Sequence, residues 1–221
     1  MRVLVLAVVA LLVAAFSGGK SRLPSMPAGL SLRQEADRVV VQWNGPVEAP
    51  MRERFAEAFE QLENDPRRIV ISLHSPGGSV AHGREVIKEI RIASRARQID
   101  TVIEAGRFCA SMCVPIYLVG AERLAHPAAK FMFHEASFRL TPEQQRALQE
   151  LKRSAPALHV EAMQKTAIMQ VTNELFDDDF GPRSIDARWL EKMRSSIRGR
   201  DVWLTAAQLV QQGSGVVDKL Y

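Results

Sequence analysis

The stretch IVISLHSPGG, residues 69–78, decides the fold class of this chain. Its apolar, β-branched first half predicts a buried strand over 68–73, and Ser75-Pro76-Gly77-Gly78 predicts a tight turn into a helix over about 79–95. Two glycines after a proline can turn their backbone N–H groups outward, and the following helix adds its dipole. The turn could therefore bind a negatively charged oxygen, or it could simply connect a strand to a helix.

Strand and helix patterns alternate on both sides of this stretch. Strands are expected at 38–43, 101–104, 123–125, 130–133 and, as a final short strand, 216–217. Helices are expected at about 50–62, 111–119, 142–175 with an interruption near Pro156, 187–197 and 205–213. Such alternation predicts an α/β domain with mainly parallel strand pairing.

Composition and charge limit the class of protein. The chain has 221 residues, enough for one well-buried domain. Its net charge of +4 arises from 29 basic and 25 acidic side chains, and no long basic run accompanies it. A nucleic-acid partner is therefore not expected.

The N-terminal residues have the pattern of an export signal. Arg2 is followed by an uncharged apolar run, Val3 to Phe16, and then by small residues around Ser17. This predicts a signal peptide over 1–17. The run is shorter than the roughly 20 residues of a spanning helix, although an uncleaved membrane anchor is the alternative. Either reading places the rest of the chain outside the cytoplasm, as a linker at 18–36 and a domain at 37–221.

A serine lies among small residues in GRFCASMC, residues 106–113. Taken alone, Ser111 in such a place usually only permits close packing, His134 after an apolar strand is usually a core or rim residue, and Asp201 is usually part of a surface ion pair. Together with the glycine turn they supply a nucleophile, a base and an anion-binding backbone. This combination predicts acyl-transfer chemistry.

Four segments in this order resemble the Clp protease proteolytic subunit and its relatives in the Clp/crotonase superfamily. They are Ile71 to Gly78, Cys109 to Met112, Phe131 to His134, and Arg200-Asp201 with the LTAA that follows at 204–207. The resemblance runs from about residue 38 to the C-terminus. It is strongest to predicted exported members that carry cysteines around the serine.

This resemblance implies a Ser-His-Asp serine peptidase on repeated strand–strand–helix units with a helical handle region. Ser111 would be the nucleophile, His134 the general base, and Asp201 the residue that orients His134. The backbone N–H groups of Gly78 and Met112 would form the oxyanion hole. The segment between His134 and Asp201 is longer than is usual in the family, so two alternatives for the third position are Asp218 and Asp186.

Cys109 and Cys113 are the only cysteines, and they flank Ser111. In an exported protein such a pair is usually a disulfide. Residues four apart in a regular helix have Cβ atoms about 6 Å apart, beyond the reach of a disulfide. A bridge would therefore need Cys109 in the turn before the helix, and two buried thiols are the alternative.

Three adjacent carboxylates, Asp177 to Asp179, allow either a metal site or a solvated acidic loop. No ordered ligand spacing accompanies them, so the loop is preferred and no metal or other cofactor is expected.

The function expected from the whole chain is an exported serine endopeptidase. Its substrates would be peptides or proteins, and it would form a homo-oligomer through the helical stretch from Pro142 to about Leu175. A cytoplasmic ATPase could not reach an exported domain, so the peptidase would act without one. The alternatives are a non-catalytic binding or assembly protein with the same fold, and a crotonase-like enzyme acting on acyl-CoA thioesters.

Overall fold

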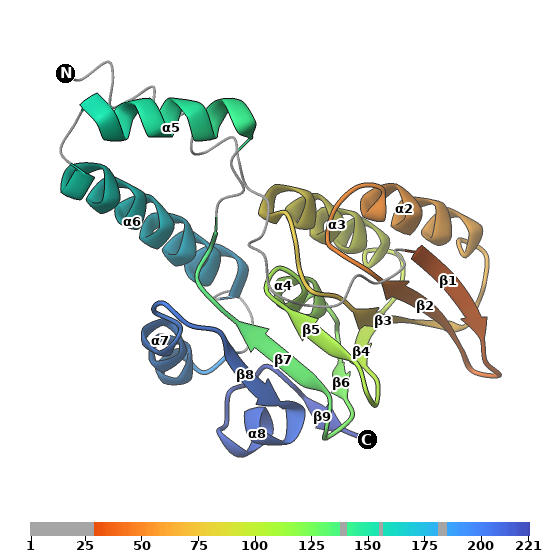
Figure 1. The fold of residues 1–221 in the computed structure, drawn as a ribbon. Coiled ribbons are helices and arrows are strands. Elements are labelled where there is room, and N and C mark those ends of the chain that lie inside the picture. The colour runs from red at the N-terminus through yellow and green to blue at the C-terminus, as the bar shows by residue number, and fades with distance from the viewer. Residues whose placement is uncertain (1–28, 138–140, 155–156, 181–184) are drawn as a thin grey trace.

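A six-stranded sheet forms the centre of the fold in the computed structural model, which describes residues 29–137, 141–154, 157–180 and 185–221 (Figure 1). Its strand order is β1-β2-β3-β4-β6-β9. The strands from β2 onward pair in parallel, and β1 pairs with β2 antiparallel. The strands are β1 (Gly29–Gln34), β2 (Arg38–Asn44), β3 (Arg68–His74), β4 (Ile99–Ile103), β6 (Arg123–Ala125) and β9 (Lys219–Leu220).

A smaller sheet of three strands has the order β5-β7-β8, with bounds β5 (Phe108–Ala110), β7 (Lys130–Phe133) and β8 (Val202–Thr205). β5 pairs with β7 in parallel, and β8 pairs with β7 antiparallel. The main-chain bridge between Ser75 and Cys109 joins this sheet to the end of β3. The residues that follow β3, β5 and β7 are thereby brought to one region.

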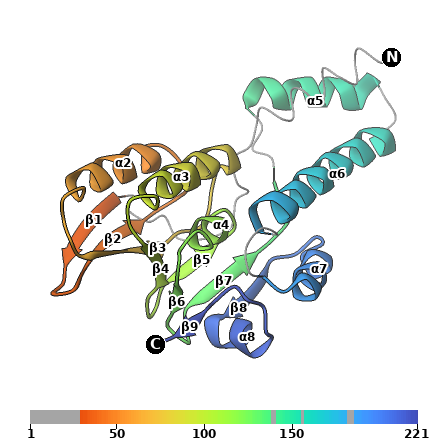
Figure 2. The same cartoon turned by 180° about the vertical axis from the view of Figure 1, so that it is seen from behind.

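The helices are α2 (Met51–Gln61), α3 (Val80–Ala93), α4 (Cys113–Tyr117), α5 (Pro142–Ser154), α6 (Ala157–Glu174), the π-helix η1 (Leu175–Phe180), α7 (Ala187–Ser196) and α8 (Ala206–Gln211). α2 and α3 lie side by side against the large sheet, whereas α5 and α6 project away from both sheets (Figures 1 and 2). Within the described ranges, no helix combines the length and apolar character needed to cross a membrane.

The core lies between the large sheet and helices α2 to α4. Alternate residues of β2 are fully buried or nearly so, and they belong to the same cluster as Phe55 of α2 and Ile90 of α3. Side chains that alternate along a strand point to opposite faces, so β2 and β3 each bury one complete apolar row against the helices. This packing fixes the end of β3, where the Ser75 to Gly78 turn begins.

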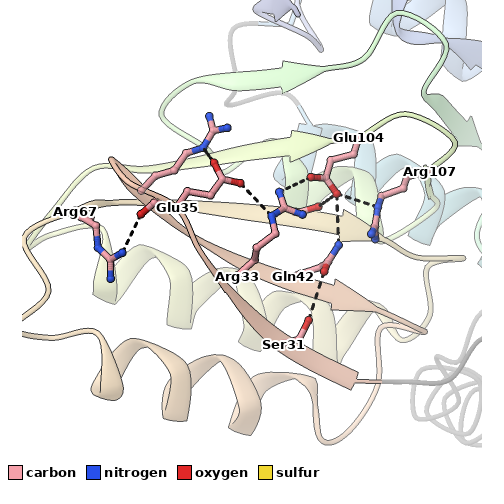
Figure 3. A network of polar contacts seen from close by, with 9 residues as sticks. Ser31, Arg33, Glu35, Gln42, Arg67, Glu104 and Arg107 are labelled. Carbon is pink, nitrogen blue, oxygen red and sulfur yellow. Dashed lines mark hydrogen bonds and ion pairs between the residues drawn. The ribbon is translucent and has the colours of Figure 1, made fainter.

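The other face of the large sheet carries a polar network centred on Glu104, which follows β4 (Figure 3). Its carboxylate accepts hydrogen bonds from Arg33 Nη2 at 2.7 Å and Ser72 Oγ at 3.0 Å, and forms an ion pair with Arg107 Nε at 3.0 Å. Burial acts to raise the pKa of Glu104, but the bonds from Arg33 and Ser72 outweigh it and lower that pKa. The network ties β1 to the rest of the sheet.

The prediction of a linker over 18–36 is therefore wrong for its last part, because residues 29–34 form strand β1 of the domain. The sequence of β1 is largely polar, and its pairing with β2 stabilises it as a strand. The predicted signal peptide, residues 1–17, lies outside the described residues.

Smaller differences from the expected elements have similar causes. Strands β5 and β8 were not expected, since each is short and exists through its pairing with β7. The predicted helix at 111–119 is shorter, because its first two residues belong to a turn. Val216 and Val217 are buried but not in a strand, and the final strand is Lys219–Leu220.

Candidate active site

Ser111 occupies the turn between β5 and α4 in a strained backbone conformation. Its φ is 53°, and it is the one non-glycine residue with positive φ in the part of the chain that the structure describes. This conformation costs about 1–2 kcal/mol for an L-residue, so it persists only where neighbouring contacts impose it. The Ser111 N–H donates to Met132 O at 2.9 Å, and Ser111 O accepts from Val114 N at 2.9 Å.

The glycine turn after β3 packs directly against this serine turn. Ser75 N donates to Phe108 O at 3.0 Å, and Ser75 O accepts from Ala110 N at 3.0 Å. A Cβ atom added to Gly77, whose φ is +84°, would lie 2.6 Å from Ser111 Cβ and 2.5 Å from Ala110 O. Only glycine therefore permits this approach.

Two backbone donors adjoin Ser111. Within the described ranges, neither the Gly78 N–H nor the Met112 N–H donates a hydrogen bond to another group. The Met112 nitrogen lies 3.1 Å from the position that a Cβ at Gly77 would take, so the serine turn packs against the residue that precedes Gly78. Unused N–H groups beside a nucleophile can stabilise a developing negative oxygen.

His134 follows β7 directly, and its side chain is 17% exposed. Its Nε2 atom lies 2.7 Å from Ser111 Oγ. Burial lowers the pKa of His134, and the nearby Asp201 and Glu135 carboxylates partly offset this by raising it. The ring is therefore mainly neutral near pH 7, which is the form that accepts a proton from a serine hydroxyl.

Asp201 precedes β8, and antiparallel pairing of Phe133 with Val202 brings it beside His134. Its Oδ1 atom lies 3.9 Å from His134 Nδ1, and its side chain is half exposed. This separation is too long for a hydrogen bond, and the contact becomes an ion pair only when His134 is protonated. Glu135, which sequence reasoning missed, accepts a hydrogen bond from Gly199 N at 2.9 Å and so anchors the chain just before Asp201.

The arrangement combines a serine in a strained turn, a histidine at hydrogen-bonding distance, a nearby carboxylate and two free backbone donors. A family model described as Clp protease matches residues 32–178 of the chain. The chain belongs to the Clp protease family. No curated protein matches it.

Membership of the Clp protease family confirms the predicted fold class and supports a protease in general. Members of the family are usually oligomers that act on peptides or proteins. The matched stretch includes Ser111, His134 and the glycine turn, and it ends before Asp201.

The two aspartates that were alternatives to Asp201 as the third triad residue, Asp218 and Asp186, form hydrogen bonds with other groups. Asp218 Oδ2 accepts from Arg123 Nε at 2.8 Å and from Arg123 N at 2.9 Å. Asp186 caps α7, where its Oδ1 accepts from Trp189 N at 2.8 Å. The structure brings Asp201, and neither of these two, to His134.

The acidic run was expected to be a solvated loop. Asp177 and Asp178 are exposed as expected, but the prediction of a loop is wrong, because the run lies in the π-helix η1. Arg84 of α3 holds Asp179 with an Nη2–Oδ2 distance of 2.9 Å, and Arg194 of α7 pairs with Asp177. In the described part of the chain, no group of three His, Cys, Asp or Glu side chains could hold a metal ion.

The expected disulfide joins Cys109 and Cys113 in the structure, with Cα atoms 5.2 Å apart. Cys113 is the first residue of α4, and Cys109 lies outside the helix as the geometry of a disulfide requires, although in strand β5 rather than in the expected turn. Both side chains are fully buried.

Gly83 is a further residue of the site that sequence reasoning missed. It lies in the first turn of α3, and a Cβ there would lie 2.4 Å from Met112 Cγ. The Met112 side chain thus occupies the space beside Gly83. A glycine inside an otherwise amphipathic helical pattern was the signal that could have indicated this contact.

Proposed function

We propose that the chain is an exported serine endopeptidase that hydrolyses peptide bonds without an ATPase. Ser111 is the nucleophile, His134 the general base, and Asp201 the carboxylate that orients and stabilises the histidine. The observation that carries this proposal is the 2.7 Å contact between Ser111 Oγ and His134 Nε2. The strained backbone of Ser111 adds support, because such strain collects at functional sites.

The reaction uses each group in turn. His134 takes the hydroxyl proton as Ser111 Oγ attacks the carbonyl carbon of the scissile bond. The carbonyl oxygen becomes negative and accepts hydrogen bonds from the Gly78 and Met112 N–H groups. His134 then gives its proton to the leaving amine, and a water molecule activated by the same histidine hydrolyses the acyl-enzyme.

Asp201 acts on this cycle through charge. When His134 carries the proton, the carboxylate stabilises the imidazolium, and the 3.9 Å separation between Nδ1 and Oδ1 permits that interaction. In proteases without substrate, catalytic hydrogen bonds are often long and shorten when substrate binds. We infer the same shortening for this pair.

Export and assembly complete the proposal. The apolar run Val3 to Phe16 and the buried disulfide are both typical of a chain that folds in an oxidising compartment. The chain would act there as a homo-oligomer, with α5 and α6, which project from the body (Figures 1 and 2), as the pairing elements. Light scattering that finds only monomer at micromolar concentration contradicts the oligomer.

Labelling with a fluorophosphonate probe tests the function. The oxidised protein should react at Ser111, and Ser111→Ala and His134→Ala should abolish labelling. Ser196→Ala is the matched control, because Ser196 is partly exposed and its hydroxyl donates to Lys192 O, one helical turn away on the same helix. A folded, oxidised protein that does not label is not a serine peptidase, and the non-catalytic binding protein becomes the better description.

A further inference from the structure

The disulfide encloses the residues that the proposed reaction depends on. Its ring runs from Cys109 to Cys113 and contains Ala110, Ser111 and Met112. It therefore holds both the nucleophile and one of the two oxyanion donors. No other disulfide or free cysteine is present in the chain, because these are its only cysteines.

We propose that the Cys109–Cys113 disulfide is a positioning element of the active site, which holds Ser111 Oγ toward His134 and the Met112 N–H toward the oxyanion. This role rests on the proposed peptidase function. The two cysteines touch no reacting atom and act through Ser111 and Met112.

The elements on both sides of Ser111 are short. β5 has three residues and α4 has five, and Met112 at the start of α4 makes no side-chain capping hydrogen bond. Elements of this length hold their geometry through contacts with the rest of the fold rather than by themselves. Ser111, which lies between them, adopts a conformation that L-residues rarely adopt.

Hydrogen bonds secure only parts of this turn. Ser111 N is bonded to Met132 O, and Val114 N is bonded to Ser111 O. The first bond holds the serine to β7, and the second continues into α4. The disulfide directly links β5 to the first residue of α4, so it limits how far the strand and the helix can separate or rotate around Ser111.

The bridge must form before or during folding, because both cysteines are fully buried in the folded chain. Its formation removes two protons and two electrons from the thiol pair. A disulfide-bearing oxidant accepts them by thiol–disulfide exchange and becomes a pair of thiols. A chain that folds where thiols stay reduced would then have a poorly positioned nucleophile.

The expected effect falls on the rate of the chemical step. A misplacement of about 1 Å can reduce a rate by about 100-fold. We therefore expect loss of the bridge to reduce kcat and the rate of fluorophosphonate labelling about 10- to 100-fold. The KM for a peptide substrate should change less than about twofold, because loss of an interaction made only in the transition state lowers kcat alone.

The experiment compares the oxidised protein with Cys109→Ala, Cys113→Ala and the double variant at a temperature well below every Tm. Each single variant removes the same disulfide as the double variant, so kcat should fall by the same factor in all three variants. This equality separates the bridge from the packing of each side chain, since independent packing losses would multiply. Protein refolded in a thiol reductant should match the double variant, and the double variant itself should be insensitive to reductant.

Ile116→Ala is the matched control, because Ile116 is fully buried in the same helix and takes no part in the bridge. Ile116→Ala should lower Tm, as a packing loss in the core does, and its kcat should stay within about twofold of that of the oxidised protein. If the double alanine variant does not fold, the combination of Cys109→Val with Cys113→Ala takes its place in the experiment, because valine restores part of the buried volume. Circular dichroism establishes folding in each case.

Two results would overturn the positioning role. One is a folded double variant with the kcat of the oxidised protein, and the other is an equal loss of kcat in Ile116→Ala. Failure of the peptidase function has a different signature, because the oxidised protein itself would then neither label nor cleave.

Discussion

His134 contacts Ser111 more closely than it contacts Asp201. Its Nε2 atom lies 2.7 Å from Ser111 Oγ, whereas its Nδ1 atom lies 3.9 Å from Asp201 Oδ1. The nucleophile and base are thus already hydrogen-bonded. The Asp201 carboxylate is half exposed to solvent and too far from the His134 ring for a hydrogen bond. This asymmetry predicts unequal effects when the three residues are substituted.

Asp201→Asn should reduce kcat/KM about 10²- to 10⁴-fold. His134→Ala should reduce kcat/KM at least about 10-fold more than Asp201→Asn does, which is the order of losses measured in other catalytic triads. The reason is that removing the base stops proton transfer, whereas removing the carboxylate weakens the orientation and charge of the base. Steady-state kinetics with a fluorogenic peptide measures both.

Glu135→Gln is the control for this comparison, because Glu135 also raises the pKa of His134 but hydrogen-bonds to Gly199 instead of facing the ring nitrogen. It should reduce kcat/KM less than Asp201→Asn does. A larger loss in Glu135→Gln would assign the third position to Glu135.

The pH profile of kcat/KM should report the neutral form of His134. Burial lowers the pKa of this residue from its ordinary value of 6.5, so activity should fall only when the pH drops below 6.5. Asp201 raises that pKa, and Asp201→Asn should therefore move the acid limb to still lower pH. An acid limb above pH 6.5, or a shift toward higher pH in the variant, contradicts this assignment.

The sequence predicted the parts of the fold that local patterns specify. The strand, glycine turn and helix from Arg68 to about Arg95 were expected because apolar periodicity and turn residues coincide there. Strands β5 and β8 were not, because Phe108–Ala110 and Val202–Thr205 become strands only through pairing with β7. Strand formation of this kind depends on tertiary context rather than on propensity.

The same limit explains what could be predicted of the site. Ser111 and His134 each follow an apolar run, and the parallel pairing of β5 with β7 then places them together. The choice between Asp201 and the alternatives, Asp186 and Asp218, depended on the antiparallel pairing of β7 with β8, which no local pattern indicates. The direction of single N–H groups, such as that of Met112, is likewise a tertiary property.

Gly77→Ala should inactivate the protein by displacing Ser111. The added methyl group would lie 2.6 Å from Ser111 Cβ and 2.5 Å from the Ala110 carbonyl oxygen, and the backbone there cannot yield without moving the nucleophile. A shift of about 1 Å costs about 100-fold in rate, so we expect at least that loss in kcat.

Gly106→Ala is the matched control for Gly77→Ala. Gly106 also has positive φ, but nothing lies within 4 Å of its added Cβ. It should lower stability by about 1 kcal/mol through backbone strain and leave kcat near that of the unmodified protein. Equal kcat losses in the two variants would show that backbone strain, rather than contact with Ser111, explains the effect.

Gly83→Ala should slow the reaction through Met112, because the new Cβ would lie 2.4 Å from Met112 Cγ and 2.7 Å from Met112 Cε. A flexible methionine side chain can move, so we expect a smaller loss than for Gly77→Ala, about 10-fold in kcat.

Truncating Met112 tests the cause of that loss, since the backbone N–H proposed to bind the oxyanion stays in place. Met112→Ala removes the Cγ and Cε atoms that the new methyl group meets. Gly83→Ala combined with Met112→Ala should therefore recover activity relative to Gly83→Ala alone, and the two substitutions should be strongly non-additive in a double-mutant cycle. Additive losses would mean that Gly83 affects the reaction by a route other than contact with Met112.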